Sequence, residues 1–180
     1  ISAVRDGKCI DTTMGFTPLD GVLMGTRTGS VDPSAVTFVA QKHGFTPNEM
    51  SDYMNKKSGF LGLSGVSSDN REVSAAAAHG DKRACLVNEM LAYQIKKDIG
   101  AYTAAMNGVD AIIFTGGIGE NDPPTRENSC SDLDFFGIKI DKELNKTVRG
   151  KKCKISTPDS KVEVWVIPTN EELLIARDTK

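Results

Sequence analysis

The chain has 180 residues, of which 39% are hydrophobic and 26% are charged. This length and composition favour a single α/β domain with one buried core, and no run of about eighteen apolar residues is present to span a membrane. The formal net charge of -2, without any run of three lysines or arginines, argues against a nucleic-acid partner.

The chain begins with a predicted β-hairpin. Residues 1–4 and 9–11 are short extended runs, and the Asp6-Gly7 pair between them is typical of a tight hairpin turn. Residues 14–33 then contain glycines and prolines too often for a regular element. We predict a long functional loop there.

Helix-capping signals come next. Asp-Pro at 32–33 and Gly44 bound a first helix, and the capping box Thr-Pro-Asn-Glu at 46–49 opens a second helix that ends near Gly59. The glycine-rich segment 60–67 is predicted to be a connection between helices.

A short helix and a long helix follow. Ser68 or Asp69 can cap a helix that runs through the four alanines at 75–78 and stops at Gly80. From residue 81 to about residue 106, apolar side chains recur at helical spacing and predict a long amphipathic helix. Its buried stripe is predicted to consist of Leu86, Met90, Ile95, Ile99, Tyr102 and Met106.

The rest of the chain alternates strands and helices. Residues 110–115 predict a buried strand that leads directly into a glycine loop at 116–121. A helix at 125–133, an extended segment at 154–156, a strand at 162–167 and a helix at 170–178 complete the order. Because no low-complexity linker interrupts the chain, we expect no internal domain boundary. The predicted fold is α/β, with a mixed sheet flanked by helices.

Three short segments carry residue types suited to binding a phosphate, a flat ring or a metal ion. The glycine-rich turn at 116–119 follows a strand, and glycines let backbone amides approach an anion or a ring. Arg27 lies between glycines, where its planar guanidinium could meet a phosphate or a carboxylate. Glu171 and Glu172 begin a helix after a strand, where carboxylates could reach Mg²⁺. Each pattern also has a structural explanation, namely a tight connection, a solvated arginine and helix capping.

Seven segments together resemble the C-terminal half of the acetate kinase family. They are Asp11–Gly21, Met24–Ser30, Asn55–Gly59, Gly62–Asp69, Phe114–Asn121, Ile155–Asp159 and Val166–Ala176. Their order and spacing also match over nearly the whole chain. The resemblance implies that residues 1–180 are the C-terminal nucleotide-binding domain of such a kinase, with the ribonuclease-H-like, actin-like ATPase fold of the acetate and sugar kinase superfamily. The family's N-terminal domain would lie upstream of Ile1 and be absent from this chain.

The resemblance implies roles for two segments of the first half of the chain. Arg27 corresponds to the family's active-site arginine, which would stabilise charge on the transferring phosphoryl group. Asp69, Asn70 and Arg71 fall on the segment that contacts adenosine. Asn70 is a departure, because the family usually has a hydrophobic residue between the acid and the arginine, and it could alter the packing of adenosine.

Two further segments would complete the nucleotide site. The resemblance implies that Gly117 and Ile118 line the adenine pocket, where a bare backbone and one apolar side chain suit a flat base. Gly119 and Asn121 adjoin that pocket. Glu171 corresponds to the family's magnesium-associated glutamate, and the neighbouring Glu172 is the second candidate for this role.

The activity implied by the resemblance is phosphoryl transfer. Acetate kinases transfer a phosphoryl group reversibly between ATP and acetate, giving acetyl phosphate and ADP, and they require Mg²⁺. A homodimer formed through this domain is also implied. Because other active-site groups of the family would lie upstream, we predict no measurable turnover by the 180 residues alone.

Two alternatives stay open at this point. Propionate kinase has similar motifs, and its acyl-chain pocket is largely built by the half that is missing here. A non-catalytic nucleotide-binding module from a truncated gene is the other alternative.

The cysteines and histidines indicate no further site. The four cysteines form no CxxC pair or metal-ligand spacing, which fits reduced structural thiols and a cytoplasmic protein. His43 and His79 lie near predicted helix ends, where a surface or capping role is expected for each.

Overall fold

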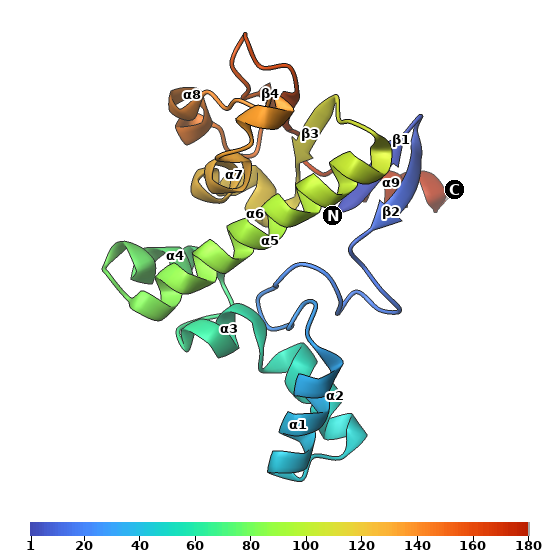
Figure 1. Cartoon of the computed structure of the whole chain (residues 1–180), viewed down its shortest axis with the longest axis vertical. Coiled ribbons are helices and arrows are strands. Elements are labelled where there is room, and N and C mark those ends of the chain that lie inside the picture. Colours follow the sequence, from blue (N-terminus) through green and yellow to red (C-terminus); the bar gives the residue numbers. More distant parts are fainter. Residues whose placement is uncertain (180) are drawn as a thin grey trace. The chain divides into compact units, whose positions relative to one another are not determined.

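The structure, a computed structural model, describes residues 1–179 and divides the chain into two compact units, Ile1–Met106 and Asn107–Lys180. Figure 1 labels the helices and strands of both units. The division falls directly after a long helix, where Asn107 and Gly108 both have positive φ. No linker composition marks this position, so the sequence alone does not reveal the division.

The first unit begins with the predicted hairpin. β1 (Ser2–Arg5) and β2 (Lys8–Thr12) are antiparallel, and the turn residues Asp6 and Gly7 have φ of 53° and 74°. A two-residue hairpin turn of this kind needs positive φ at both positions, which explains the Asp-Gly pair. Residues 13–32 contain no helix or strand, as predicted.

Two capped helices follow this loop. α1 (Pro33–His43) ends at Gly44, which has a φ of 66°. α2 (Pro47–Lys56) begins with the reciprocal capping box of Thr46 and Glu49. Both helices and their N-terminal caps confirm the predictions, although α2 ends at Lys56, before the predicted end near Gly59.

Residues Gly59–Ser64 form a helix, α3, where the sequence predicts a connection. That prediction is wrong because tertiary burial outweighs the poor helix propensity of glycine. Phe60 is only 1% exposed, and Ser64 is buried with its hydroxyl donating to the Phe60 carbonyl at 2.6 Å.

The predicted pair of helices is α4 (Asn70–Ala78) and α5 (Lys82–Met106), with Asp69 as the N-cap of α4. The predicted buried stripe of α5 is confirmed only at Ile99, because Leu86 is 52% exposed and Met90, Ile95, Tyr102 and Met106 are half-buried. α5 contacts α3, α4 and β1, so contact with these neighbouring elements, rather than side-chain size, selects its buried face. The buried residues are Ala84, Val87, Leu91, Ala92, Ile99 and Thr103.

The second unit contains a three-stranded mixed sheet in the order β3-β5-β4. β3 (Ala111–Phe114) is parallel to β5 (Glu163–Val166), and β4 (Cys153–Lys154) is antiparallel to β5. This arrangement confirms the predicted mixed sheet. The prediction that β3 is buried is wrong within the chain, because Phe114 alone among its residues is buried and Ile113 is 55% exposed.

Short helices connect the strands of this sheet. α6 (Gly116–Asn121) and α7 (Pro123–Cys130) follow β3, and α9 (Glu171–Asp178) follows β5. The predicted glycine loop is therefore a helix, and α7 begins and ends before the predicted 125–133. α8 (Lys142–Thr147) and a short 3-10 helix before it are not predicted by the sequence. The apolar core of the unit includes Leu133, Ile138, Val148, Ile155, Val164 and Val166.

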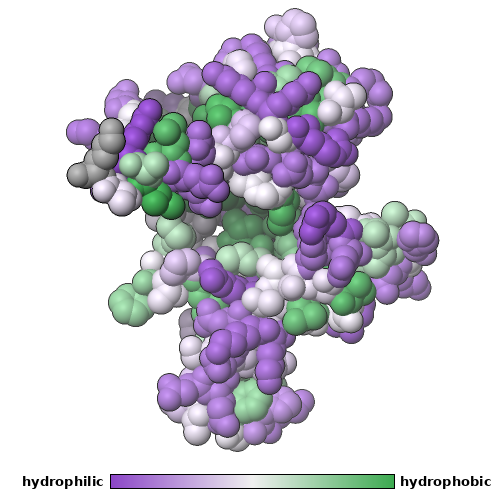
Figure 2. Space-filling model, turned by 180° about the vertical axis from the view of Figure 1, so that it is seen from behind, coloured by the Kyte–Doolittle hydropathy of each residue, from purple (hydrophilic) through white to green (hydrophobic). Residues whose placement is uncertain are grey.

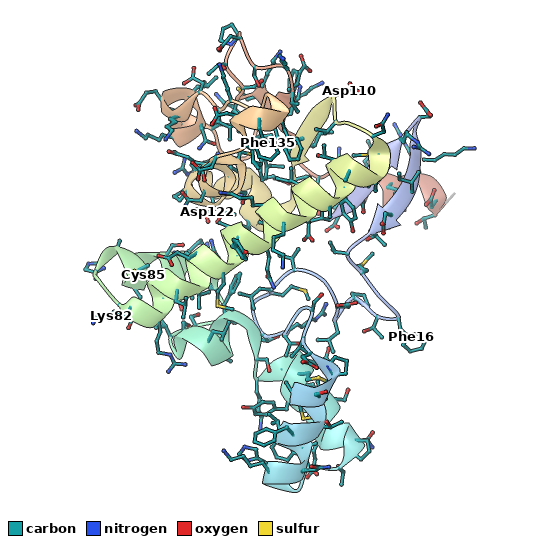
Figure 3. All side chains as sticks on the ribbon, viewed as in Figure 1. Phe16, Lys82, Cys85, Asp110, Asp122 and Phe135 are labelled. Atoms are coloured by element: carbon teal, nitrogen blue, oxygen red, sulfur yellow. The ribbon has the colours of Figure 1, made fainter. Side chains whose placement is uncertain are left out.

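The surface mixes polar and apolar residues. On the face drawn in Figure 2, hydrophilic and hydrophobic residues are interspersed. Phe16, labelled in Figure 3, projects from the loop at 13–32 and is fully exposed. Among residues 1–179 there is no helix with the length and apolar character needed to cross a membrane.

Candidate functional site

Main-chain hydrogen bonds hold the loop at 13–32 against α3 and the residues before it. The carbonyls of residues 24–26 accept hydrogen bonds, each of 2.9 Å, from the amides of Phe60, Leu61 and Ser58. The segment that contains Arg27 therefore has a defined conformation, although it is neither helix nor strand.

Gly59 permits this close approach. Its φ is +62°, and a Cβ at this position would lie 2.8 Å from both the amide nitrogen and the carbonyl oxygen of Arg27. The carbonyl oxygen of Met24 would be closer still. Because real side chains do not tolerate such contacts, the conformation around Arg27 requires glycine at position 59.

The Arg27 side chain is exposed. Within residues 1–179 its guanidinium forms no ion pair, and its nearest recorded partner is the sulfur of Met24, 4.0 Å from Nη1. A planar, permanently charged group on a well-held main chain is suited to bidentate binding of a phosphate or a carboxylate.

Asp69 and Arg71 form an ion pair at the start of α4. Arg71 Nη2 donates to Asp69 Oδ2 at 2.6 Å, and the Arg71 amide donates to Asp69 Oδ1 at 2.8 Å. These hydrogen bonds, the side-chain bond first, lower the pKa of Asp69 to about 2. A Cβ on Gly25 would lie 2.6 Å from the Ser68 carbonyl oxygen, so the segment that carries Asp69, Asn70 and Arg71 adjoins the arginine loop.

In the second unit, the predicted adenine-binding residues lie on α6. A Cβ on Gly117 would meet no atom within 4 Å, so this side of the helix is open, and the neighbouring Ile118 is half-buried. A Cβ on Gly119 would instead lie 3.2 Å from the backbone of Phe114, so this glycine lets α6 pack on β3. Asn121 Nδ2 donates to the Gly117 carbonyl at 3.0 Å and supports the turn.

Glu120 connects α6 to the chain that leaves β5. Its Oε1 accepts hydrogen bonds from the amides of Gly116 and Thr169, both at 2.8 Å. Thr169 Oγ1 accepts a longer bond of 3.2 Å from the Gly116 amide and pairs with Thr115 Oγ1 at 2.8 Å. Glu120 is not predicted as a site residue from the sequence. The available signal is a carboxylate four residues after the first residue of a helix that directly follows a strand.

The predicted metal-associated residue, Glu171, follows Thr169 by two residues. Glu171 and Glu172 are exposed in the first turn of α9, and Asn170 caps the helix by accepting from the Leu173 amide at 3.3 Å. In the part of the chain that the structure describes, no three His, Cys, Asp or Glu side chains form a metal-binding group.

A buried arginine supports α6 from the core. Arg126 on α7 is completely buried and donates to the carbonyls of Gly119, Asn145 and Val148 at 2.9, 3.1 and 2.8 Å. It also donates to Asn145 Oδ1 at 2.8 Å. Burial and the positive charge of Arg149 lower the pKa of Arg126, while the charge of Asp122, labelled in Figure 3, acts in the opposite direction.

Comparison with known proteins decides the family. The acetokinase family matches residues 1–177. The chain belongs to the acetokinase family. It is similar to the acetate kinase of Bacteroides thetaiotaomicron, with 59% identity over 179 residues that cover 99% of this chain and 45% of that relative.

Solved structures of acetokinases share the fold. A crystal structure of Porphyromonas gingivalis acetate kinase superimposes with a TM-score of 0.95 at 50% identity, covering 99% of this chain and 45% of that one. A crystal structure of a propionate kinase from Francisella tularensis has a TM-score of 0.90 at 43% identity, covering 98% of this chain and 45% of that one. The chain therefore spans a little under half of the proteins that it matches.

The acetokinase family implies a nucleotide and Mg²⁺, and the residues present fit both. The open side of α6 at Gly117 leaves room for a flat ring, and the exposed Arg27 has no ion-pair partner among residues 1–179. Glu171 offers one exposed carboxylate. One carboxylate is enough, because Mg²⁺ usually takes one or two from the protein and its remaining ligands from water and phosphate.

The Asp69–Arg71 pair predicts a titration at unusually low pH. Because the folded-state pKa of Asp69 is about 2, below its ordinary 3.8, the stabilising effect is fully present above pH 3.8 and is lost as the pH falls toward 2. Arg71→Ala should raise this pKa, since the Arg71 side chain is its main cause. A carboxyl-detected NMR titration measures the midpoint for Asp69. Arg149→Ala is the control, and an unchanged midpoint in Arg71→Ala would contradict the pairing.

Proposed function

We propose that the complete protein is an acetate kinase and that this chain supplies its nucleotide-handling half. The observation that carries the proposal is the 59% identity to an acetate kinase across 99% of the chain. Because the chain spans 45% of that relative, we expect turnover to require the part of the polypeptide that corresponds to the remaining length.

The site residues take complementary roles in this proposal. Arg27 binds the transferring phosphoryl group and stabilises the negative charge that develops on it. The segment Asp69–Arg71 contacts adenosine, and Gly117 and Ile118 line the adenine pocket. Glu171 holds Mg²⁺, which when bound neutralises charge on the phosphates.

We also propose that the complete protein is a cytoplasmic homodimer. Leu173, Leu174 and Ile175 on α9 are 45%, 59% and 64% exposed, which is apolar surface that a second chain or the rest of the polypeptide would cover. Cys9, Cys85 and Cys153 form no disulfide within residues 1–179, as expected in a reducing compartment.

Propionate kinase is the second candidate, because the Francisella tularensis propionate kinase has the same fold at 43% identity. Assays of the complete protein with ATP, Mg²⁺ and either acetate or propionate separate the two. We expect the higher kcat/KM with acetate. A higher kcat/KM with propionate would indicate that the complete protein is a propionate kinase. Nucleotide binding without transfer to either acid would indicate a non-catalytic module.

Titration of Mg-ADP into the complete protein tests the nucleotide contacts. We expect Gly117→Val to fill the open side of α6 and Arg71→Ala to remove a polar contact, each weakening binding by about tenfold or more. Gly117→Val should fold normally, because a Cβ there meets nothing within 4 Å.

Matched controls exist for both variants. Gly100→Val also adds a side chain where a Cβ meets nothing within 4 Å, and Arg149→Ala removes another exposed arginine. Neither should change the affinity. Binding that stays at the native affinity in Gly117→Val would refute the assignment of α6 to the adenine site.

A further inference from the structure

Glu120 receives two main-chain hydrogen bonds from segments that are distant in the sequence. The amides of Gly116 and Thr169 both donate to the same oxygen, Oε1, at 2.8 Å. Gly116 begins α6 directly after β3, and Thr169 lies between β5 and α9. One carboxylate thus connects the two segments that leave the sheet.

These two amides need an acceptor because the strand ladder ends before them. β3 and β5 pair in parallel up to Phe114 and Val166, and the Ile167 amide makes a last ladder bond to the Phe114 carbonyl at 3.0 Å. Beyond that point neither Gly116 nor Thr169 can donate within the sheet. A single side-chain oxygen has two lone pairs, so Oε1 can accept from both amides.

The contact is more than a helix cap. A cap would explain the bond from Gly116, which belongs to the same helix as Glu120. It does not explain the bond from Thr169, which is 49 residues away in the sequence. On the core side, Arg126 Nη1 binds the Gly119 carbonyl at 2.9 Å, so α6 is held at both faces.

We infer that Glu120 is a positioning residue. It fixes the position of the adenine-binding turn at Gly117 relative to the metal-associated Glu171. Gly117 follows one of its two amide donors by one residue, and Glu171 follows the other by two. The inference rests on the proposed function, because that proposal assigns nucleotide to Gly117 and Mg²⁺ to Glu171. Glu120 itself contacts neither ligand in this arrangement.

Side-chain reach and charge can be separated by substitution. Glu120→Gln keeps the length and one acceptor oxygen, whereas Glu120→Asp keeps the charge but is one methylene shorter. In the complete protein we expect Glu120→Asp and Glu120→Ala to raise the KM for Mg-ATP and the half-saturating Mg²⁺ concentration together, by about tenfold each. Glu120→Gln should stay within about threefold of the native values.

A control variant and a second readout complete the test. Glu127→Ala removes a carboxylate from the neighbouring helix α7, where it pairs with Lys142 at 3.0 Å, and should leave both parameters unchanged. NMR shifts of the Gly116 and Thr169 amides should change together in Glu120→Asp and be retained in Glu120→Gln. If Glu120→Ala does not fold, the Asp and Gln variants still decide the matter.

The outcomes distinguish this inference from the proposal beneath it. If Glu120→Asp has a native KM and Mg²⁺ dependence while Gly117→Val binds Mg-ADP weakly, the positioning role of Glu120 is overturned and the proposed nucleotide site stands. A Gln variant as impaired as Ala would also overturn it, because charge rather than reach would then be decisive. If Gly117→Val binds nucleotide normally, the proposed nucleotide site fails, whatever the Glu120 variants do.

Discussion

Replacing Arg126 with alanine should lower the free energy of unfolding by about 3–5 kcal/mol. The side chain is completely buried, and its loss would remove four hydrogen bonds and leave a cavity in the second unit. Trp165, the single tryptophan of the chain, lies on β5 in the same unit. Urea unfolding followed by Trp165 fluorescence measures the effect.

Two companion variants sharpen this result. Arg126→Lys keeps the charge but cannot place donors at four separate acceptors, so we expect it to be destabilised as well. Arg149→Ala removes an exposed arginine whose Nη1 donates to the Lys146 carbonyl at 2.7 Å, and should cost less than about 0.5 kcal/mol. Equal stability of Arg126→Ala and Arg149→Ala would mean that the buried network is dispensable.

Replacing Arg27 with alanine should lower kcat of the complete protein by about a thousandfold. The expected loss is catalytic, because the guanidinium is exposed and forms no ion pair with any residue from 1 to 179. Stability should therefore change by less than about 0.5 kcal/mol. Steady-state kinetics and thermal unfolding of the same preparation separate the two effects.

The nature of the Arg27 contact can be tested with two more variants. Arg27→Lys retains the positive charge without the planar fork, and should recover only part of the lost activity. Arg5→Ala removes an exposed arginine from β1 of the same unit and should behave as native. A native kcat in Arg27→Ala would exclude a role for this side chain in phosphoryl transfer.

Local signals in the sequence predicted most element boundaries. The Asp6-Gly7 turn, the capping box of Thr46 and Glu49, and the N-cap Asp69 all have the predicted conformations. Each of these features depends on a few adjacent residues and on backbone geometry. They are therefore visible without knowledge of the tertiary structure.

Features that depend on distant contacts could not be predicted in the same way. α3 is helical despite Gly62 because Phe60 is buried, and the buried face of α5 is set by its contacts with α3, α4 and β1. The apolar sequence of β3 predicts a buried strand, yet Ile113 is exposed within the chain. Apolar composition shows that a segment can be buried, but the neighbouring elements decide whether it is.

The candidate site likewise contains residues that local sequence signals predict and residues whose role depends on distant contacts. The surrounding glycines and the resemblance to a family predict Arg27 and Gly117 as site residues, and their ligand contacts stay predictions. The role of Glu120 is not visible in the sequence, because its partner Thr169 is 49 residues away. Gly59 likewise has no local pattern that would connect it to Arg27.

The loop at 13–32 also bears on the energetics of phosphoryl transfer. Its carbonyls at 24–26 already accept hydrogen bonds from the amides of Phe60, Leu61 and Ser58, and Gly59 lets the two main-chain segments pack closely. The entropy of ordering this segment is therefore lost when the protein folds rather than when a phosphate arrives. A charge carried on such a backbone needs little reorganisation during the reaction, because hydrogen bonds and close packing hold this loop in one conformation despite its many glycines.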